Sequence, residues 1–185
     1  MAIRSFADVP NRIVRLFLQE AGRQYDVNRG YPKFGKMTQA LLNRFDGCCA
    51  YCGTPPPPVL VAEHLVPMNR ESVGLHAWGN VVPACKHCND IKKGNPWHVH
   101  SELNNHRRAA IETYIAQYGY DPDVAELQVV LGKLYDLADK QTRALVDFAL
   151  VASQPYIEGF HKEVLPVTDE ASDDLSDDVT DQVEG

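Results

Sequence analysis

The sequence lacks the segments that direct a chain into or across a membrane. Its first residues, MAIRSFADVP, contain no apolar stretch of the kind found in a secretory signal. No apolar run approaches the roughly 20 residues that a membrane-spanning helix needs. These absences predict a soluble, cytoplasmic protein with no membrane partner, in a compartment where thiols stay reduced.

Basic residues are missing from the C-terminal segment 167–185, which carries eight acidic residues. Without those eight acids the formal net charge of −7 becomes +1. The bases gather elsewhere: residues 4–46 hold eight bases and four acids, and residues 86–108 hold five bases and two acids. Segregated charge of this kind fits a protein that contacts a phosphate backbone, although a solvated surface of mixed charge gives the same pattern.

Cysteine is scarce, and four of the five cysteines form two Cys-x-x-Cys pairs, Cys49 with Cys52 and Cys85 with Cys88. Two intervening residues allow a tight turn to aim both sulfur atoms at one point, and two such turns supply the four ligands of tetrahedral zinc. We therefore predict a structural Zn²⁺. A thioredoxin-like redox pair is the alternative, but two pairs occur and neither lies in a βαβ unit. Cys48 is expected to pack as a small apolar residue, and the alternative is that it replaces Cys49 as a ligand in a looser turn.

The order of elements predicts an α+β fold that is mostly helical. Helices are expected over about 10–25, 37–47 and 103–118, with a short one after residue 85 and one or two within 125–153; strands are expected at 59–63 and 81–82. We expect four parts: an N-terminal helical and basic segment 1–46, a finger 47–98 that carries the chemistry, a C-terminal helical segment 99–167, and a disordered acidic tail 168–185.

Four polar residues lie between or directly after the cysteine pairs. Glu63 and His64 interrupt the apolar run VLVAEHLVP, Asn80 precedes the second strand, and Asn89 follows the last cysteine. Taken singly, each is an ordinary structural or turn residue. Together they offer an imidazole that can accept a proton near neutral pH and oxygen ligands that suit Mg²⁺ or Mn²⁺. This combination is what hydrolysis of a phosphodiester requires.

The order Cys-x-x-Cys, EHLVP and GNVVPACKHCNDIKKG resembles the HNH endonuclease family, in the subgroup whose ββα-metal finger is braced by a four-cysteine zinc. The resemblance covers about residues 46–97. It implies that His64 is the general base, that Asn80 fixes the loop of the finger and orients the base, and that Asn89 is a ligand of the catalytic cation. Glu63 stands where the family most often has Asp, also a ligand of that cation.

The resemblance implies a metal-dependent endonuclease that acts on DNA in a phage, a mobile element, or a restriction or other defence system. One finger holds one active site, so cutting both strands would need a homodimer, a partner subunit or two successive binding events. The alternative is a non-catalytic zinc module that binds nucleic acid or protein. The cations that we expect to contact DNA are Lys92, Lys93, Arg107, Arg108, Arg29, Lys33 and Lys36.

Overall fold

The computed structural model describes residues 5–55 and 59–160. The predicted tail 168–185 and most of the proline run 55–58 lie outside these residues. The described chain is α+β and mostly helical, as predicted. Its elements in chain order are α1 (Asp8–Asn28), α2 (Gln39–Asn43), β1 (Leu60–His64), β2 (Val81–Cys85), α3 (Lys86–Lys92), the 3₁₀ helix η1 (Trp97–Val99), α4 (Asn105–Tyr118) and α5 (Val124–Phe160).

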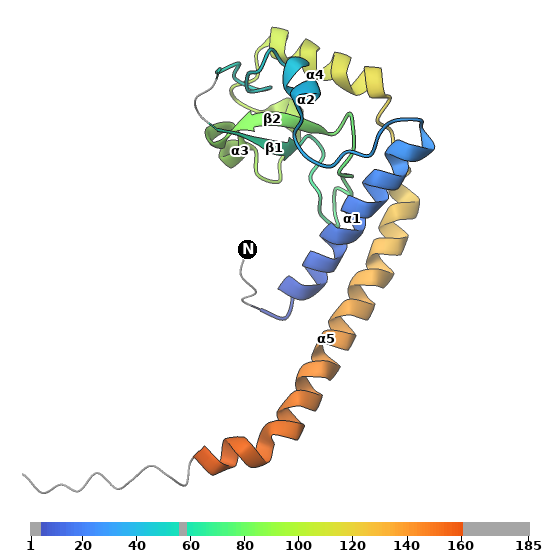
Figure 1. Ribbon diagram of the computed structural model, residues 1–185, viewed down its shortest axis with the longest axis vertical. Coiled ribbons are helices and arrows are strands. Elements are labelled where there is room, and N and C mark those ends of the chain that lie inside the picture. The colour runs from blue at the N-terminus through green and yellow to red at the C-terminus, as the bar shows by residue number, and fades with distance from the viewer. Residues whose placement is uncertain (1–4, 56–58, 161–185) are drawn as a thin grey trace, which may run out of the picture. The chain divides into compact units, whose positions relative to one another are not determined.

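The two strands pair antiparallel and lead directly into α3, which lies beside them (Figure 1). His64, the last residue of β1, lies opposite Val81, the first residue of β2. Strand β2 is longer than the predicted pair of valines and includes Pro83. A proline cannot donate to a neighbouring strand, and a two-stranded sheet tolerates it because each strand has a free edge. The 65–80 loop joins the two strands and so begins and ends beside His64.

Short polar side chains fix where two of the helices begin. The side chain of Thr38 accepts the N–H of Leu41 at 3.3 Å, and the side chain of Asn104 accepts the N–H of Arg107 at 2.9 Å. Both contacts are N-caps, which satisfy backbone donors that the first helical turn leaves unpaired. The caps explain why α2 and α4 each begin two residues later than the apolar pattern predicts.

One hydrophobic core lies between the hairpin, α2 and α4. The phenol of Tyr114 on α4 donates to the carbonyl of Val81 at 2.9 Å, and its ring packs edge-on against Phe45 at 5.3 Å. The core also contains three of the four paired cysteines, so the two Cys-x-x-Cys turns pack in the interior of the domain. Burial of this core holds the hairpin, and the residues at its end, in one position.

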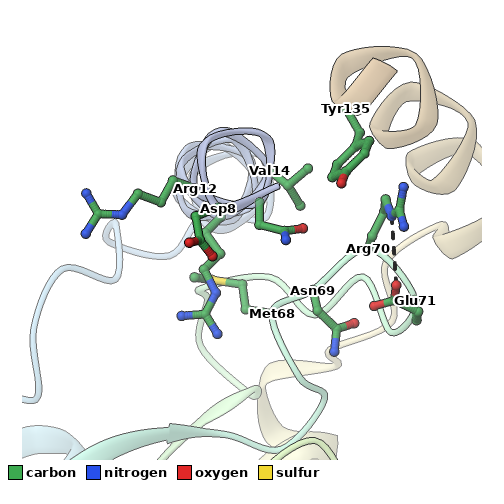
Figure 2. Close-up of a pocket in the computed structure, with 10 residues that line it drawn as sticks. Asp8, Arg12, Val14, Met68, Asn69, Arg70, Glu71 and Tyr135 are labelled. Atoms are coloured by element: carbon green, nitrogen blue, oxygen red, sulfur yellow. Dashed lines mark ion pairs between the residues drawn. The ribbon is translucent and has the colours of Figure 1, made fainter. Parts of the chain in front are cut away.

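Helix α1 is docked on the 65–80 loop rather than on the sheet. The buried carboxylate of Asp26 accepts the backbone N–H groups of Phe34 at 2.9 Å and Trp78 at 3.1 Å. A side chain at Gly22 would lie 2.5 Å from the carbonyl oxygen of His76, so only glycine allows this approach. Val14, on the same helix, belongs to a second hydrophobic cluster, against which Met68 of the loop and Tyr135 of α5 also pack (Figure 2).

Helix α5 is a single helix where the sequence predicted one or two. Within the described residues the chain divides into two units, and the boundary, between residues 145 and 146, falls inside this helix. Leu131 and Ala138 of α5 are buried within the first unit. Among the described helices, none combines the length and the apolar character that crossing a membrane requires.

Candidate metal centre and active site

The four predicted cysteines come together at one point. The sulfur atoms of Cys49, Cys52, Cys85 and Cys88 all lie within 4.8 Å of one another, and Cys52 Sγ lies 3.9 Å from Cys85 Sγ. A tetrahedron with Zn–S bonds of about 2.3 Å has edges of about 3.8 Å, so the cluster fits zinc. The predicted grouping of the cysteines is confirmed. Cys48 lies outside the cluster, with its Sγ 3.3 Å from the carbonyl oxygen of Asp46.

Local backbone contacts build the two turns that carry these sulfurs. The N–H of Gly53 donates to the carbonyl of Cys49 at 2.9 Å, which closes the first turn, and Ala50 donates to Pro83 of β2 at 2.8 Å. Cys85 caps α3, and Cys88 lies in the first turn of that helix. Burial raises the pKa of the Cys49 and Cys88 thiols. Such thiols lose their protons when a bound cation compensates the thiolate charge.

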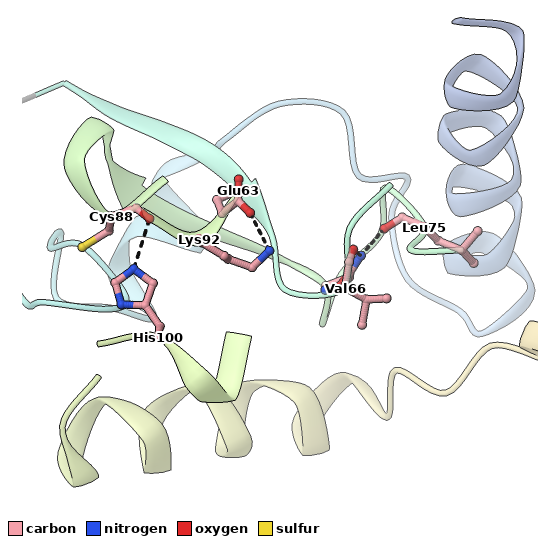
Figure 3. Close-up of polar contacts among 7 residues, drawn as sticks. Glu63, Val66, Leu75, Cys88, Lys92 and His100 are labelled. Carbon is pink, nitrogen blue, oxygen red and sulfur yellow. Dashed lines mark hydrogen bonds and ion pairs between the residues drawn. The ribbon is translucent and has the colours of Figure 1, made fainter. Parts of the chain in front are cut away.

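Glu63 is held by an ion pair that the sequence did not predict. The ammonium of Lys92 on α3 lies 2.8 Å from Glu63 Oε1, and the Lys92 side chain is completely buried whereas that of Glu63 is 12% exposed (Figure 3). Burial raises the pKa of the Glu63 carboxyl, and Lys92 opposes that shift. Lys92 was predicted to contact DNA. Its side chain is buried instead, and its charge neutralises the Glu63 carboxylate.

His64 is hydrogen-bonded to a second histidine. Its Nε2 lies 2.9 Å from Nδ1 of His76, and Nε2 of His76 lies 3.5 Å from the carbonyl oxygen of Gly35. A carbonyl only accepts, so a neutral His76 that donates through Nε2 has an unprotonated Nδ1. His64 then donates through Nε2, and its Nδ1 keeps a free lone pair. The pair thus selects the tautomer of His64 that presents Nδ1 as the basic atom.

The electrostatic surroundings keep His64 neutral. Burial, followed by the charges of His76, Lys92 and Arg15, lowers the pKa of His64 to about 3. Burial lowers the pKa of His76 as well. A neutral imidazole has the lone pair that a proton acceptor needs, and the negative charge of a bound phosphate would oppose the effect of the nearby cations.

Asn80 is fully buried and ties the two ends of the 65–80 loop together. Its Oδ1 accepts the N–H of Val66 at 2.8 Å, while its Nδ2 donates to the carbonyls of Val66 at 3.1 Å and Leu75 at 2.7 Å. These bonds fix the positions of Val66, two residues after His64, and of Leu75, the residue before His76. Asn80 therefore acts on His64 through the path of the loop, and the structure records no direct hydrogen bond between them within residues 59–160.

Glu63 and His64 share a small pocket of about 110 Å³, whose other lining residues are Arg15, Pro67, Met68 and Lys93. Asn89 does not line this pocket. It lies half-buried on α3, and its carbonyl accepts the N–H of Lys93 at 3.0 Å. Of the predicted catalytic residues, the structure thus brings Glu63 and His64 to one cavity, whose lining includes neither Asn80 nor Asn89.

Apart from the buried Lys92, the six other cations predicted to contact DNA fall into two groups. Lys33, Lys36 and Lys93 are exposed. Arg29, Arg107 and Arg108 are half-buried and engaged within the fold. The Arg29 guanidinium lies over the ring of Tyr25 at 4.8 Å, and Arg108 donates to the carbonyl of His98 at 2.9 Å. Arg107 packs against Gly53 in the first cysteine turn. The exposed lysines are therefore the better candidates for a phosphate backbone.

Sequence reasoning missed His76, the counterion role of Lys92, and Arg15. Lys92 follows Asn89 by three residues in a short helix. This spacing was a weak indication that Lys92 is buried, because one face of that helix must pack on β1. The residues His76 and Arg15 carried no motif. Both reach the site through the docking of α1 and the loop, which no local pattern reports.

Comparison with known proteins agrees with this geometry. The family model described as HNH endonuclease matches residues 49–95, which include both cysteine pairs, Glu63, His64, Asn80 and Asn89. No curated protein and no solved structure matches the chain. Residues 49–95 thus match the HNH endonuclease family model and contain the four-cysteine cluster, whereas α1, α4 and α5 lie outside the matched segment.

Proposed function

We propose that the protein is a metal-dependent endonuclease that hydrolyses phosphodiester bonds of DNA. The observation that carries the proposal is the shared pocket of Glu63 and His64 at the end of β1. It places a carboxylate and a neutral imidazole side by side, within a segment that matches an endonuclease family.

His64 is the proposed general base. Its Nε2 is engaged with His76, so Nδ1 is the atom that accepts a proton from water. His76 acts as a positioning residue because it fixes both the tautomer and the direction of the ring. The proton of the attacking water passes to Nδ1, and the hydroxide oxygen forms a bond to phosphorus. The bond from phosphorus to the leaving sugar oxygen breaks, and that oxygen takes the electron pair and is then protonated by solvent.

Glu63 and Asn89 are the proposed ligands of a divalent cation, Mg²⁺ or Mn²⁺. Carboxylate and amide oxygens suit such hard cations, which keep several waters and take further ligands from substrate phosphates. When bound, the cation would neutralise charge on the phosphate and the leaving oxygen. Lys92 already neutralises part of the Glu63 charge, so Glu63 alone offers a weak cation site and the phosphate must complete it.

DNA is the proposed substrate because exposed lysines lie near His64, the proposed general base. Gly35, whose carbonyl accepts from His76, is flanked in the sequence by Lys36 and, two residues earlier, by Lys33. Lys93 lines the pocket itself. Phosphate contacts of this kind position a strand without reading its sequence.

The test is nicking of supercoiled plasmid by the wild-type protein and by His64→Ala, with Mg²⁺, Mn²⁺ or EDTA. We expect wild-type nicking that requires the cation and a loss of about 10²- to 10⁴-fold in His64→Ala, the usual effect of removing a general base. Asn89→Ala should also lose activity, and raised Mn²⁺ should restore part of it. Equal nicking by His64→Ala, after purification that excludes contaminating nuclease, would overturn the role of His64, whereas a wild-type protein that does not nick would favour the non-catalytic zinc module.

A further inference from the structure

Arg15 lines the catalytic pocket although it lies far outside the HNH segment in the sequence. It belongs to α1 and is exposed. No ion pair of Arg15 is recorded with any acid of residues 5–55 and 59–160. Its position beside Glu63 and His64 places a free guanidinium where the substrate phosphate must enter.

The position of Arg15 is set by the docking of α1. Seven residues separate Arg15 from Gly22, so the two lie on one face of the helix, two turns apart. Gly22 packs on the backbone of His76, and Leu18 accepts the N–H of His76 at 3.4 Å. The contacts that hold His76 against His64 are therefore the contacts that hold Arg15 over the pocket.

A larger pocket of about 380 Å³, drawn in Figure 2, adjoins the catalytic pocket. The two pockets share Arg15 and Met68. The larger one is lined by three arginines and two acids, so its charge is positive. One of these arginines, Arg70, lies over the ring of Tyr135 at 4.0 Å and 3.8 Å from the Glu71 carboxylate, which holds it at the far wall.

We propose that Arg15 binds a phosphate group of the nucleic-acid strand at the mouth of the catalytic pocket, and that the strand continues into the larger pocket toward Arg70. The inference rests on the proposed function and adds a strand path and a residue that the HNH segment does not contain. A guanidinium suits this role because its planar donors can bind two phosphate oxygens at once.

The first test measures binding without cleavage. A short fluorescein-labelled DNA duplex is titrated in EDTA with the wild-type protein, Arg15→Ala, Arg15→Lys and Lys133→Ala. Lys133 is the matched control, because it is exposed and lines neither pocket. We expect Arg15→Ala to bind about tenfold more weakly and to lower the salt slope by about 1, the value for one lost phosphate contact. Arg15→Lys should retain part of the affinity, and Lys133→Ala should match the wild type.

The second test separates the two pockets by single-turnover cleavage in Mn²⁺ at saturating protein. Arg15→Ala should slow the saturated rate at least about tenfold, since a donor near the reacting phosphate is lost. Arg70→Ala should weaken binding more than it slows the saturated rate, whereas Lys133→Ala should change neither. Thermal melting and zinc content establish that each variant is folded.

Affinity and salt slope of Arg15→Ala equal to those of Lys133→Ala would overturn the proposal, as would a wild-type protein that binds no DNA. Binding by the wild type without cleavage would overturn the hydrolytic function only, because the EDTA titration still decides the role of Arg15.

Discussion

The ammonium of Lys92 lies 2.8 Å from Oε1 of Glu63, and no part of the Lys92 side chain reaches solvent. The pair joins α3 to the end of β1, next to the proposed general base. It neutralises a carboxylate that is largely buried, where an unpaired charge would be strongly unfavourable.

Lys92→Met is expected to lower the free energy of unfolding by about 3 kcal/mol, because it leaves a buried carboxylate without its partner. The measurement is urea denaturation, with Lys93→Met, an exposed neighbour, as control. Loss of Lys92 raises the pKa of Glu63 further, so the folded state gains from protonation. The difference in the free energy of unfolding between the wild type and Lys92→Met should be largest at pH values where Glu63 is ionised. It should shrink as the pH falls through that raised pKa. A Lys92→Met protein that is as stable as the wild type but binds DNA more weakly would instead show that Lys92 contacts DNA.

The same pair predicts that the catalytic cation binds weakly without substrate. Calorimetric titration of the zinc-loaded protein with Mn²⁺ should give little heat, and addition of a duplex with a non-hydrolysable linkage should reveal tighter binding. Glu63→Ala should abolish the effect of the duplex. Tight Mn²⁺ binding by the free protein, with wild-type affinity in Glu63→Ala, would show that the cation binds elsewhere.

Zinc is expected at about one ion per chain, bound by the four clustered cysteines. Cys85→Ser should release the ion and lower both solubility and melting temperature, because the binding free energy of a structural zinc is also folding free energy. Cys48→Ser, which lies outside the cluster, should keep the ion. Elemental analysis of protein purified without chelators measures the content, and its absence from the wild type would refute the assignment.

His76→Ala should slow cleavage about tenfold without weakening DNA binding, since His64 loses the acceptor that selects its tautomer. His76→Asn places an amide oxygen close to the position of Nδ1 and should recover part of the rate. Single-turnover rates at saturating protein provide the comparison. Equal rates for wild type and His76→Ala would show that the hydrogen bond has no part in catalysis.

Truncation after Thr168 removes the eight acids of the C-terminal segment. The truncated protein should keep its nicking activity and bind DNA more tightly at low salt, because the acids repel phosphates and salt screens that repulsion. Titrations at low and high ionic strength test the effect. Loss of activity in a folded truncation would assign the segment a direct role.

The features that the sequence alone determined are those with short-range causes. Two intervening residues make a cysteine turn wherever it occurs, so the zinc cluster was predictable from Cys49–Cys52 and Cys85–Cys88. The periodicity of apolar residues located α1, α4 and α5, and the order of Glu63, His64, Asn80 and Asn89 identified the family. The ends of the helices were less predictable, because single caps such as Asn104 decide them.

Only the tertiary structure decided what surrounds the proposed base. His76 reaches His64 because Asn80 ties the 65–80 loop and Gly22 lets α1 pack on it. Arg15 reaches the same pocket through that packing. Lys92 is buried because its helix turns toward β1. Each contact joins segments separated along the chain, and its distance depends on packing against a third element, so no local pattern of residues encodes it.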